Sequence, residues 1–372
     1  MKEKEYQICT NCVMDTSDPE INFDKDGVCN HCLRFQSTIK PVWDTLSQKK
    51  LDQMIEQIKI DSKNKEYDCV IGLSGGVDSS YLAYYLKTYY PDLRMLAIHI
   101  DGGWNSELAV HNIETIVKKL NIDLHTEVIN WEEMKDLQLA YFKSQLANQD
   151  IPQDHAFFAT LYHTAVDKFD IKYFLTGSNY ATESILPASW GYSAMDGTQL
   201  KAVHKQFGKN SLKDYRTVTF FKNKIYYPYI KKFQILKPLN YIDYNKDISK
   251  DILMKEIEWK DYGGKHHESV FTKFFQAYWL PKKFGYDKRR AHLTSMILAN
   301  QISREEALRE LEITAYDIDN LESDIEYLSK KLGITVEKFK NIMAQPNKDF
   351  RDYNNEENLG KIFSNLKKLL KR

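Results

Sequence analysis

The sequence predicts an α/β protein with a doubly wound parallel sheet, a small zinc ribbon at its N-terminus and a helical C-terminal region. Three observations lead to this fold class. Short apolar strands alternate with amphipathic helices between residues 69 and 176, four cysteines fall within residues 9–32, and the pattern is helical from about residue 246. We therefore expect a zinc-binding module at 1–45, a nucleotide-binding domain at 46–245 and a helical substrate or partner domain at 246–372.

Composition excludes several classes of protein. The 372 residues are 42% hydrophobic and 28% charged, which is typical of a folded globular chain rather than a disordered one. The 52 basic residues balance 52 acidic ones, whereas a protein that grips a nucleic-acid backbone usually has a basic excess. The chain has neither an apolar run of the ~18 residues that a membrane helix needs nor the apolar core of a signal peptide. We expect a cytoplasmic protein without a nucleic-acid partner or membrane span.

Two Cys-x-x-Cys pairs, Cys9/Cys12 and Cys29/Cys32, predict a metal site. Each turn directs two thiolates at one ion, and two such turns complete the tetrahedron that zinc prefers. Disulfides would not persist in a reducing cytosol, and an iron–sulfur cluster is the remaining alternative. Four thiolates leave no open coordination position, so the zinc is expected to be structural and His31 a bystander.

A glycine-rich loop, SGGVDS (74–79), lies between an expected strand at 69–73 and an amphipathic helix. In this order, backbone N–H groups and a helix N-terminus face an anion. The loop lacks the Gly-Lys-Ser/Thr ending of a Walker A loop and the GxGxxG spacing of dinucleotide-binding loops. Its glycines allow a close backbone approach, its serines can donate hydrogen bonds, and Asp78 can help to hold Mg²⁺.

The loop resembles the SGGxDS signature of the PP-loop ATP pyrophosphatases, whose sheet is of the adenine nucleotide hydrolase type. These enzymes cleave ATP between the α- and β-phosphates and use the AMP part to activate an oxygen. The resemblance implies that the pyrophosphate end of ATP is bound by Ser74, Gly75, Gly76, Asp78 and Ser79.

The remaining strands are expected at 94–100, 124–129 and 171–176, and the helices at 106–120, 131–148 and 155–169. Ligands bind beyond the carboxyl ends of parallel strands, so the segments at 74–79, 99–105 and 177–184 should converge. In PP-loop enzymes the second strand end contacts adenine, and the loop after the fourth contacts ribose and the α-phosphate. By position, the resemblance implies ATP contacts from Ile98, His99 and Gly177. Glu183 is expected to bind Mg²⁺ or a sugar hydroxyl, or to cap a turn.

A narrower resemblance extends from about residue 8 to 345. The cysteine segment, the SGGVDS loop, TGSNYATESILPASWGY (176–192) and residues 259–308 look like the N-acetyl sugar amidotransferases of bacterial surface-glycan synthesis. The family converts an N-acetyl group to an acetamidino group. This implies that ATP and Mg²⁺ adenylate the amide oxygen of an N-acetylated sugar, free or nucleotide-linked, and that ammonia then displaces AMP.

The ammonia source is expected to be a separate protein. The sequence shows neither a glutaminase signature nor a second βα domain with a reactive cysteine. We expect a glutaminase partner, in a pair resembling the glutaminase and cyclase of histidine biosynthesis.

Within residues 259–292 we expect Lys265, His267 and Glu268 to be catalytic and Arg289 and Arg290 to bind substrate. The simpler alternative is a solvated basic helix face. A metal site at 266–268 is disfavoured, because three consecutive residues of a helix cannot all face one ion.

Two other functions stay open from the sequence. One is a PP-loop tRNA-modifying enzyme of the thiolation type, with a zinc module that grips RNA. Such thiolases need a spare cysteine near the loop, and the fifth cysteine, Cys69, is expected in a buried strand. The other is an inactive nucleotide-binding scaffold, against which the intact loop argues.

Overall fold

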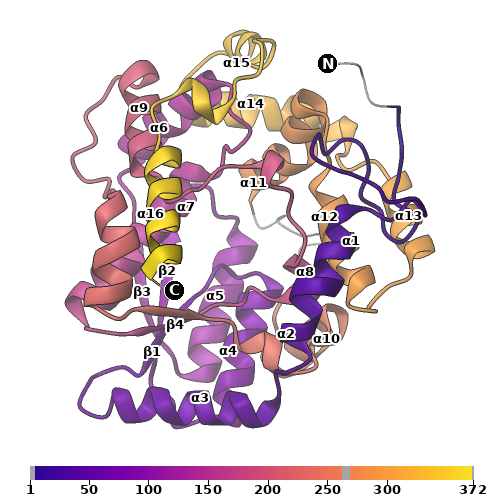
Figure 1. Cartoon of the computed structure of the whole chain (residues 1–372). Coiled ribbons are helices and arrows are strands. Elements are labelled where there is room, and N and C mark those ends of the chain that lie inside the picture. Colours follow the sequence, from indigo (N-terminus) through magenta and orange to yellow (C-terminus); the bar gives the residue numbers. More distant parts are fainter. Residues whose placement is uncertain (1–4, 262–268, 371–372) are drawn as a thin grey trace.

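The computed structural model describes residues 5–261 and 269–370, and these contain a fully parallel sheet (Figure 1). Its strands, in the spatial order β3-β2-β1-β4-β5, are β1 (Cys69–Gly72), β2 (Met95–Asp101), β3 (Asp123–Val128), β4 (Tyr173–Leu175) and β5 (Gln234–Leu236). The chain runs outward from β1 to β3 and then returns to build β4 and β5 on the other side of β1. The predicted doubly wound α/β class is confirmed, and the winding reverses between β1 and β4, where ligands bind in such sheets.

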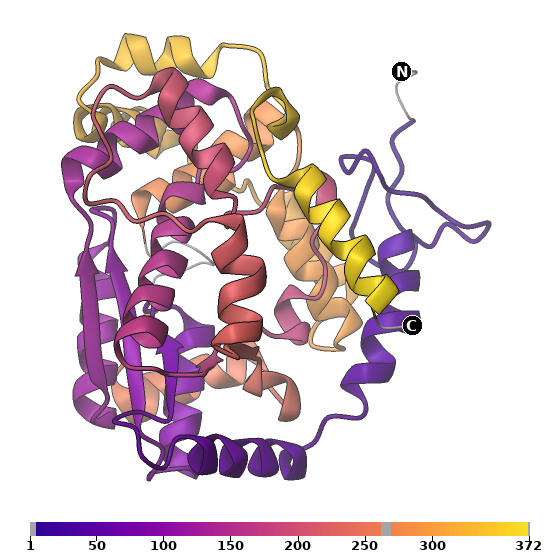
Figure 2. The ribbon, with the colours of Figure 1, turned by 60° about the vertical axis from the view of Figure 1, so that its left-hand side comes forward.

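Alternate residues of β1 pack against different helix layers. Cys69 and Ile71 join one core with helices on one face, and Val70 joins another core on the opposite face. The first layer contains α3 (Gln48–Asp61), α4 (Val77–Tyr89), α5 (Glu107–Leu120) and α10 (Lys246–Ile257). The second contains α7 (Ile151–Thr160), its π-helical continuation η2 (Leu161–Lys168) and η4 (Lys222–Ile230). Figure 2 shows helices on both sides of the strands, which explains why β1 is apolar throughout.

The helix boundaries follow from local caps and turns. Ser106 accepts a hydrogen bond from the Ala109 amide at 3.1 Å and opens α5. The helix expected at 131–148 ends earlier, as α6 (Trp131–Ser144), because Gln145 takes a left-handed conformation with φ of 62°. Strand β5 was not predicted from the sequence, since it has only three residues and lies largely exposed at the sheet edge.

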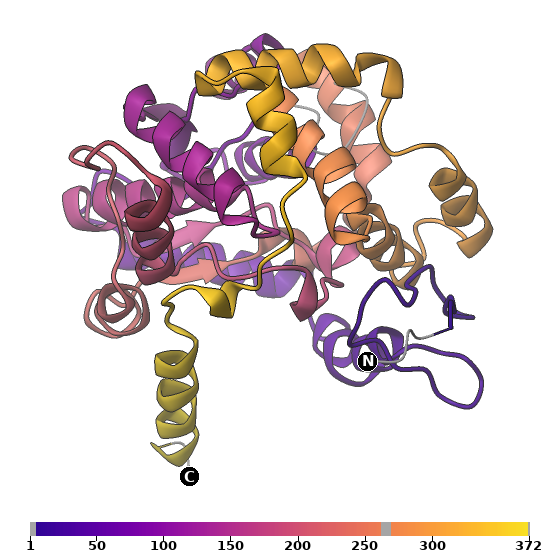
Figure 3. The ribbon, with the colours of Figure 1, turned by 90° about the horizontal axis from the view of Figure 1, so that it is seen from above.

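The C-terminal region is helical, as predicted. It contains α11 (Val270–Phe274), η6 (Phe275–Phe284), α12 (Lys288–Leu298), α13 (Arg304–Glu312), α14 (Leu321–Leu332), α15 (Val336–Met343) and α16 (Glu357–Leu370). A capping box of Ser303 and Glu306 opens α13. Figure 3 shows α16 extending away from the rest of the molecule. Among the described residues, none of the helices combines the length and apolar character that a bilayer crossing requires.

Shorter elements connect these layers. They are α1 (Asn30–Arg34), η1 (Phe35–Ile39), α2 (Lys40–Trp43), α8 (Tyr180–Glu183), η3 (Ala188–Trp190), α9 (Gly197–Phe207), η5 (Pro238–Tyr241), η7 (Ile318–Asn320) and η8 (Phe350–Asp352).

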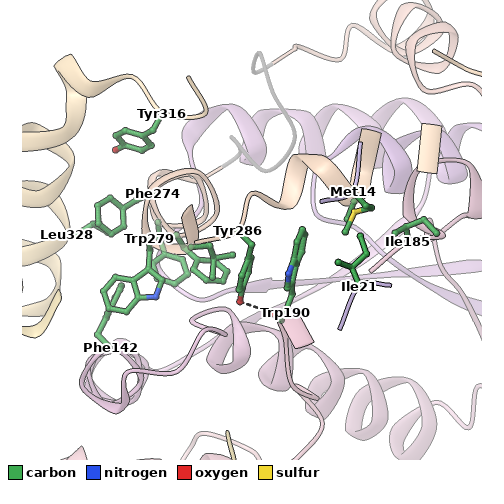
Figure 4. Packing of buried hydrophobic residues seen from close by; sticks show 14 of the residues in the cluster. Met14, Ile21, Phe142, Ile185, Trp190, Phe274, Trp279, Tyr286, Tyr316 and Leu328 are labelled. Atoms are coloured by element: carbon green, nitrogen blue, oxygen red, sulfur yellow. Dashed lines mark hydrogen bonds between the residues drawn. The ribbon is translucent and has the colours of Figure 1, made fainter. Parts of the chain in front are cut away.

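The cysteine segment shares a hydrophobic core with the helical C-terminal region (Figure 4). Met14 and Ile21 are in the same core as Trp190 and Tyr286, whose rings stack with centroids 4.7 Å apart. The Tyr286 hydroxyl also donates a 2.9 Å hydrogen bond to the Trp190 carbonyl oxygen. The N-terminal segment therefore packs as part of a larger core. The domain boundaries at 45/46 and 245/246 stay predictions.

Candidate functional site

The phosphate loop, residues 74–79, joins the end of β1 to the start of α4. Gly75 has φ of 82°, and a Cβ there would lie 2.8 Å from the Ala109 carbonyl oxygen, so the loop needs glycine at this position. The Trp259 indole donates a 2.9 Å hydrogen bond to the Gly75 carbonyl oxygen. The loop is thus held by Trp259, a residue far along the chain, as well as by the sheet.

Hydrogen bonds within the phosphate loop fix its two serines. The Ser74 and Ser79 hydroxyl oxygens lie 3.2 Å apart, and the Gly76 amide donates to Ser74 Oγ at 3.3 Å. Gly76 is the N-cap of α4 and provides no side-chain cap. Because the first amides of a helix have no partner within it, the N-terminus of α4 is a suitable receptor for phosphate oxygens.

The end of β4 lies directly against the first turn of α4. A Cβ on Gly177 would be 2.8 Å from the Asp78 carbonyl carbon and 2.9 Å from the Ser79 amide nitrogen. Only glycine allows this approach, and it places the segment after β4 beside the phosphate loop.

Two neighbours orient the Asp78 carboxylate. The Tyr244 hydroxyl and the Asn179 side-chain amide, the latter at 3.3 Å, both donate hydrogen bonds to Oδ1. Burial, together with the nearby Asp78 charge, raises the pKa of Tyr244 far above its ordinary value, so the hydroxyl stays a donor. Neither Tyr244 nor Asn179 was singled out from the sequence, because nothing local indicates that they meet Asp78.

A cavity of about 610 Å³ opens over the ends of β1, β2 and β4. The predicted site residues that line it are Ser74, Gly76, Asp78, Ser79, His99, Gly177 and Glu183. Gly75 and Ile98 are buried next to these lining residues. The convergence of the three strand ends expected from the topology is therefore present.

His99 is held as a structural histidine. Its Nδ1 lies 3.0 Å from the Leu73 carbonyl oxygen, which can only accept, and its Nε2 lies 3.0 Å from Asn105 Nδ2. Burial lowers the pKa of His99, which fits a neutral ring that donates through Nδ1 and accepts through Nε2. Both ring nitrogens are engaged, so His99 positions the strand end rather than supplying a free base.

The cavity has an opposite wall of charged and polar side chains that no sequence pattern singled out. This wall contains Asp150, Asp154, Lys246, Lys250, Asp261, Ser269, Thr272, Gln276 and Lys288. Lys250 pairs with Asp261, and Lys288 Nζ lies 3.7 Å from Asp150 Oδ2. The i,i+4 spacing of Lys246 and Lys250 places both on one helix face, but no local signal shows that this face meets the loop.

The two arginines expected to bind substrate are engaged elsewhere. Arg289 pairs with Asp287 at 2.6 Å and donates to the carbonyl oxygens of Glu310 and Ile313. Arg290 donates to the Val13 carbonyl oxygen at 2.8 Å and pairs with an Asp15 oxygen at 3.0 Å. The structure gives both guanidinium groups architectural contacts, and among the described residues of this segment the cation that lines the cavity is their neighbour Lys288.

The three predicted catalytic residues, Lys265, His267 and Glu268, lie outside the described residues. The described residues that flank this segment, Asp261 and Ser269, both line the cavity.

The four N-terminal cysteines form a compact, buried cluster, the cysteine centre. Neighbouring sulfurs, including the Cys9–Cys32 and Cys12–Cys29 pairs, are 3.7–3.9 Å apart, and all four lie within 4.8 Å of one another. Thiolates around one zinc ion, with Zn–S bonds of about 2.3 Å, are about 3.8 Å apart. The donor set therefore fits one tetrahedral ion, whereas a four-iron cluster would hold its thiolates farther apart.

Polar groups contact the cysteine centre and the backbone that carries it. Backbone amides of Asn11 and Cys29 donate to Cys9 Sγ at 3.4 and 3.2 Å. His31 turns its Nε2 to Asp18, 2.7 Å away, which agrees with its expected role as a bystander. Arg304 donates to the carbonyl oxygens of Cys9 and Cys12 at 2.9 and 3.0 Å.

Two family models match the chain. Residues 48–212 match NAD synthase, and residues 268–369 match the C-terminal domain of WbpG-like lipopolysaccharide (LPS) biosynthesis proteins. The first match and the parallel sheet define the class as a PP-loop α/β protein of the NAD synthase type. The second match adds a domain of LPS biosynthesis to this domain. The combination is the one expected of a PP-loop amidotransferase in glycan biosynthesis, and it confirms the resemblance found in the sequence.

Three solved structures resemble the chain distantly. The NH3-dependent NAD synthetase of Campylobacter jejuni subsp. jejuni NCTC 11168, in complex with nitrate, is 18% identical over 43% of this chain and 72% of its own, with a TM-score of 0.30. The U34-tRNA thiolase NcsA of Methanococcus maripaludis, with its [4Fe-4S] cluster, is 17% identical over 85% and 91% (TM-score 0.33). The NMN synthetase of Francisella tularensis is 15% identical over 82% and 98% (TM-score 0.33). No curated protein matches significantly. The fold assignment therefore rests on the sheet order and the NAD synthase match.

Proposed function

We propose that this protein is an ATP-dependent amidotransferase that converts a sugar N-acetyl group to an acetamidino group and releases AMP and pyrophosphate. The observation that carries the proposal is the composition of the cavity. Its floor is the phosphate loop, within the region that matches NAD synthase, and part of its opposite wall lies within the region that matches the WbpG-like domain. We assign ATP to the loop and an N-acetylated sugar of surface-glycan biosynthesis to the opposite wall.

The phosphate loop would hold the pyrophosphate part of ATP through Ser74, Gly75, Gly76, Asp78 and Ser79. The fixed carboxylate of Asp78 suits a Mg²⁺ ion bound with the nucleotide, and the strand ends at Ile98, His99 and Gly177 would receive the adenosine part. The lysines of the opposite wall, Lys246, Lys250 and Lys288, supply cations that can balance phosphate charge.

The chemistry requires two displacements. The amide oxygen attacks the α-phosphorus of ATP, and the bond to the β-phosphate oxygen breaks to release pyrophosphate. Ammonia then attacks the activated carbon, and AMP leaves with the oxygen that had belonged to the amide. Since an amide carbonyl is a poor electrophile, adenylation provides the leaving group, and the protein contributes mainly positioning and charge stabilisation.

Other residues complete the proposal. Glu183 lines the cavity and is a proposed ligand of the sugar. Lys288, which also lines the cavity, takes the substrate-binding role that the sequence had suggested for Arg289 and Arg290. Lys265, His267 and Glu268 remain proposed catalytic residues. A separate glutaminase would supply ammonia, and the reaction is assigned to the cytoplasm.

We further propose that the cysteine centre holds a structural Zn²⁺ through Cys9, Cys12, Cys29 and Cys32. Four thiolates fill the coordination shell, so the ion would stabilise the fold and take no part in the reaction.

The tRNA thiolation alternative would need a reactive cysteine near the phosphate loop, and Cys69 does not fit this role. Cys69, the only cysteine outside the cysteine centre, is completely buried in β1. Burial also raises the pKa of its thiol well above the ordinary value, opposite to the shift of a reactive cysteine.

A direct test incubates the full chain with ATP, Mg²⁺, ammonium and a panel of N-acetylated and diacetamido sugars, free and nucleotide-linked. We expect AMP and pyrophosphate only with an accepted sugar, and a product whose mass reflects replacement of one oxygen by NH. ADP and orthophosphate as the sole by-products, or AMP formation that depends on tRNA instead, would refute the proposal.

A further inference from the structure

Helix α7 crosses the cavity above the ends of β1 and β2. A Cβ on Gly72, the last residue of β1, would lie 2.7 Å from Cζ of Phe157. A Cβ on Gly102, just beyond β2, would lie 3.5 Å from Cγ of Gln153. Asp154 follows Gln153 and precedes Phe157 by three residues, which places it on the same side of the helix as Phe157. Its side chain lines the cavity above the start of the phosphate loop.

The Asp154 carboxylate has charged neighbours but no direct partner among the described residues. Asp150, one turn earlier on α7, is paired with Lys288 of α12 at 3.7 Å. The Lys288 ammonium also lies over the Phe275 ring, 5.4 Å from its centroid, which fixes its direction. Lys288 is therefore paired with Asp150 and not with Asp154, which stays open to the cavity.

The cavity walls change the acidity of Asp154. The Asp154 side chain is accessible to solvent within the cavity. Partial desolvation by the surrounding protein and the adjacent Asp150 raise the pKa of Asp154 to about 7, while Lys288 opposes the rise. Tyr215, on the segment behind α7, is the other titratable neighbour, and its own pKa is raised by burial and by Asp154. A carboxylate that is half ionised near neutral pH is suited to accept a proton in a reaction.

We propose that Asp154, beside the Asp150–Lys288 pair, is the base that takes the proton released when ammonia attacks the adenylated amide carbon. The inference rests on the proposed amidotransferase function and adds the acceptor side of the site.

The proton transfer decides which group leaves. The ammonia lone pair forms the new C–N bond while the carbon–nitrogen π pair of the adenylated amide moves to the amide nitrogen. The result is a tetrahedral adduct that carries NH₃⁺ and O-AMP. While the extra proton remains, ammonia is the better leaving group and the adduct returns to its precursor. Transfer of one proton to an Asp154 oxygen leaves NH₂, whose lone pair forms the C=N bond as the C–O bond to AMP breaks. The product is an amidinium cation, and Asp154 passes its proton to water.

The test separates the two steps in the full chain. Sugar-dependent exchange of pyrophosphate into ATP reports adenylation without ammonia, and mass spectrometry reports amidine formation with ammonium. For Asp154→Asn we expect exchange within about threefold of wild type and amidine formation lower by ~10²-fold or more, the usual share of a general base. Hydroxylamine, a weaker base that attacks as the neutral molecule, should recover part of the lost rate.

Two further variants make the test specific. Asp251→Asn, on the exposed side of α10, is the matched control and should leave both reactions unchanged. Lys288→Gln removes the cation that lowers the pKa of Asp154. At a fixed concentration of free ammonia, the pH at which amidine formation reaches half of its maximal rate should therefore be higher than in wild type. A purely architectural role for Lys288 would not move this profile.

Each alternative outcome has one meaning. Normal amidine formation by Asp154→Asn overturns the inference while leaving the proposed function intact. Equal loss of both reactions with an increased Mg²⁺ requirement also overturns it, because the carboxylate would then hold the metal of ATP. Absence of exchange by wild type with every N-acetylated sugar rejects the proposed function itself, and the inference with it.

Discussion

The cysteine centre and the phosphate loop are both short motifs that stand out in the sequence, and the fold places them in opposite surroundings. The four cysteines are at most 1% exposed, and backbone amides and Arg304 cover them. The hydroxyls of Ser74 and Ser79 and the first turn of α4 line a cavity. The comparison teaches that a strong ligand pattern indicates binding but not reactivity. Reactivity requires that the groups face a space which a substrate can enter.

The two regions are nevertheless linked through the C-terminal helices. Phe275 belongs to the core that contains the cysteines, and Gln276, the next residue, lines the cavity. Arg290 and Lys288 are two residues apart on α12, one contacting the cysteine segment and the other the cavity. Stability at the cysteine centre should therefore influence the position of the cavity wall, and substitutions in each region can measure how far this coupling extends.

The largest effect is expected from Cys29→Ser. Isolated zinc sites gain ~10 kcal/mol from the metal at neutral pH, so the loss of one ligand should remove the ion and cause a larger drop in the free energy of unfolding than any substitution in the cavity. Metal analysis and calorimetric unfolding measure this. Cys69→Ala, which removes the cysteine outside the cluster, should keep the metal. Full stability of metal-free Cys29→Ser would contradict the structural role.

Asp78→Asn should separate the two regions most clearly. It keeps the shape and the hydrogen-bond acceptor for Tyr244 but removes the charge beside the phosphates, so AMP formation should fall by ~10²-fold or more. The thermal midpoint and the metal content should be unchanged. Wild-type turnover in this variant is the result that rejects the assigned role of the loop.

Gly177→Ala should reduce nucleotide affinity by ~10-fold, about 1.4 kcal/mol. The new Cβ would lie 2.8 Å from the Asp78 backbone and must displace the first turn of α4. Calorimetric titration with a non-hydrolysable ATP analogue measures the loss. Gly360→Ala is the control, since nothing lies within 4 Å of a Cβ there. Equal affinity for both variants would show that the contact between the β4 end and α4 is not needed.

Arg304→Ala tests the coupling between the regions. It removes the hydrogen bonds to the Cys9 and Cys12 carbonyl oxygens, and we expect a loss of ~2 kcal/mol in unfolding free energy. Arg309→Ala, on the exposed side of the same helix, should cost less than ~0.5 kcal/mol. A decrease in sugar-dependent exchange by Arg304→Ala alone would show that the cysteine centre supports the cavity wall.

The smallest expected effect is a pH dependence of stability from Asp154. Its folded-state pKa, about 7, lies above the ordinary carboxyl value, so between these values the folded protein binds more protons than the unfolded chain. This contribution to stability is present at low pH and is lost as the pH rises through about 7. Asp154→Asn should therefore raise the thermal midpoint relative to wild type at pH 8 more than at pH 5. A constant difference across this range would contradict the raised pKa.

Local sequence was sufficient for the central elements of the fold. The apolar run at 69–73 predicted β1, and the spacing of the cysteines predicted their cluster. Each signal involves groups only a few residues apart along the chain, or a ligand geometry that few other arrangements satisfy. The three-residue strand β5 was missed because its side chains are partly exposed and give no alternation.

The cavity wall opposite the loop depended on long-range packing. The sequence pointed to Arg289 and Arg290, yet their guanidinium groups have partners at the end of α13 and in the cysteine segment. Lys288 enters the cavity because of the direction in which α12 begins, and Asp154 because α7 crosses the ends of β1 and β2. No property of these residues in isolation distinguishes them from solvated charges.

The sequence by itself determined the parallel sheet, the phosphate loop and the four cysteines of the cysteine centre, because hydrophobic periodicity, backbone freedom at glycine and thiolate spacing act over short distances. The tertiary structure alone decided which charges surround the loop, and that the cysteine segment shares its core with the C-terminal helices. Those arrangements arise from contacts between segments more than one hundred residues apart, such as Trp259 with Gly75 and Arg304 with Cys9.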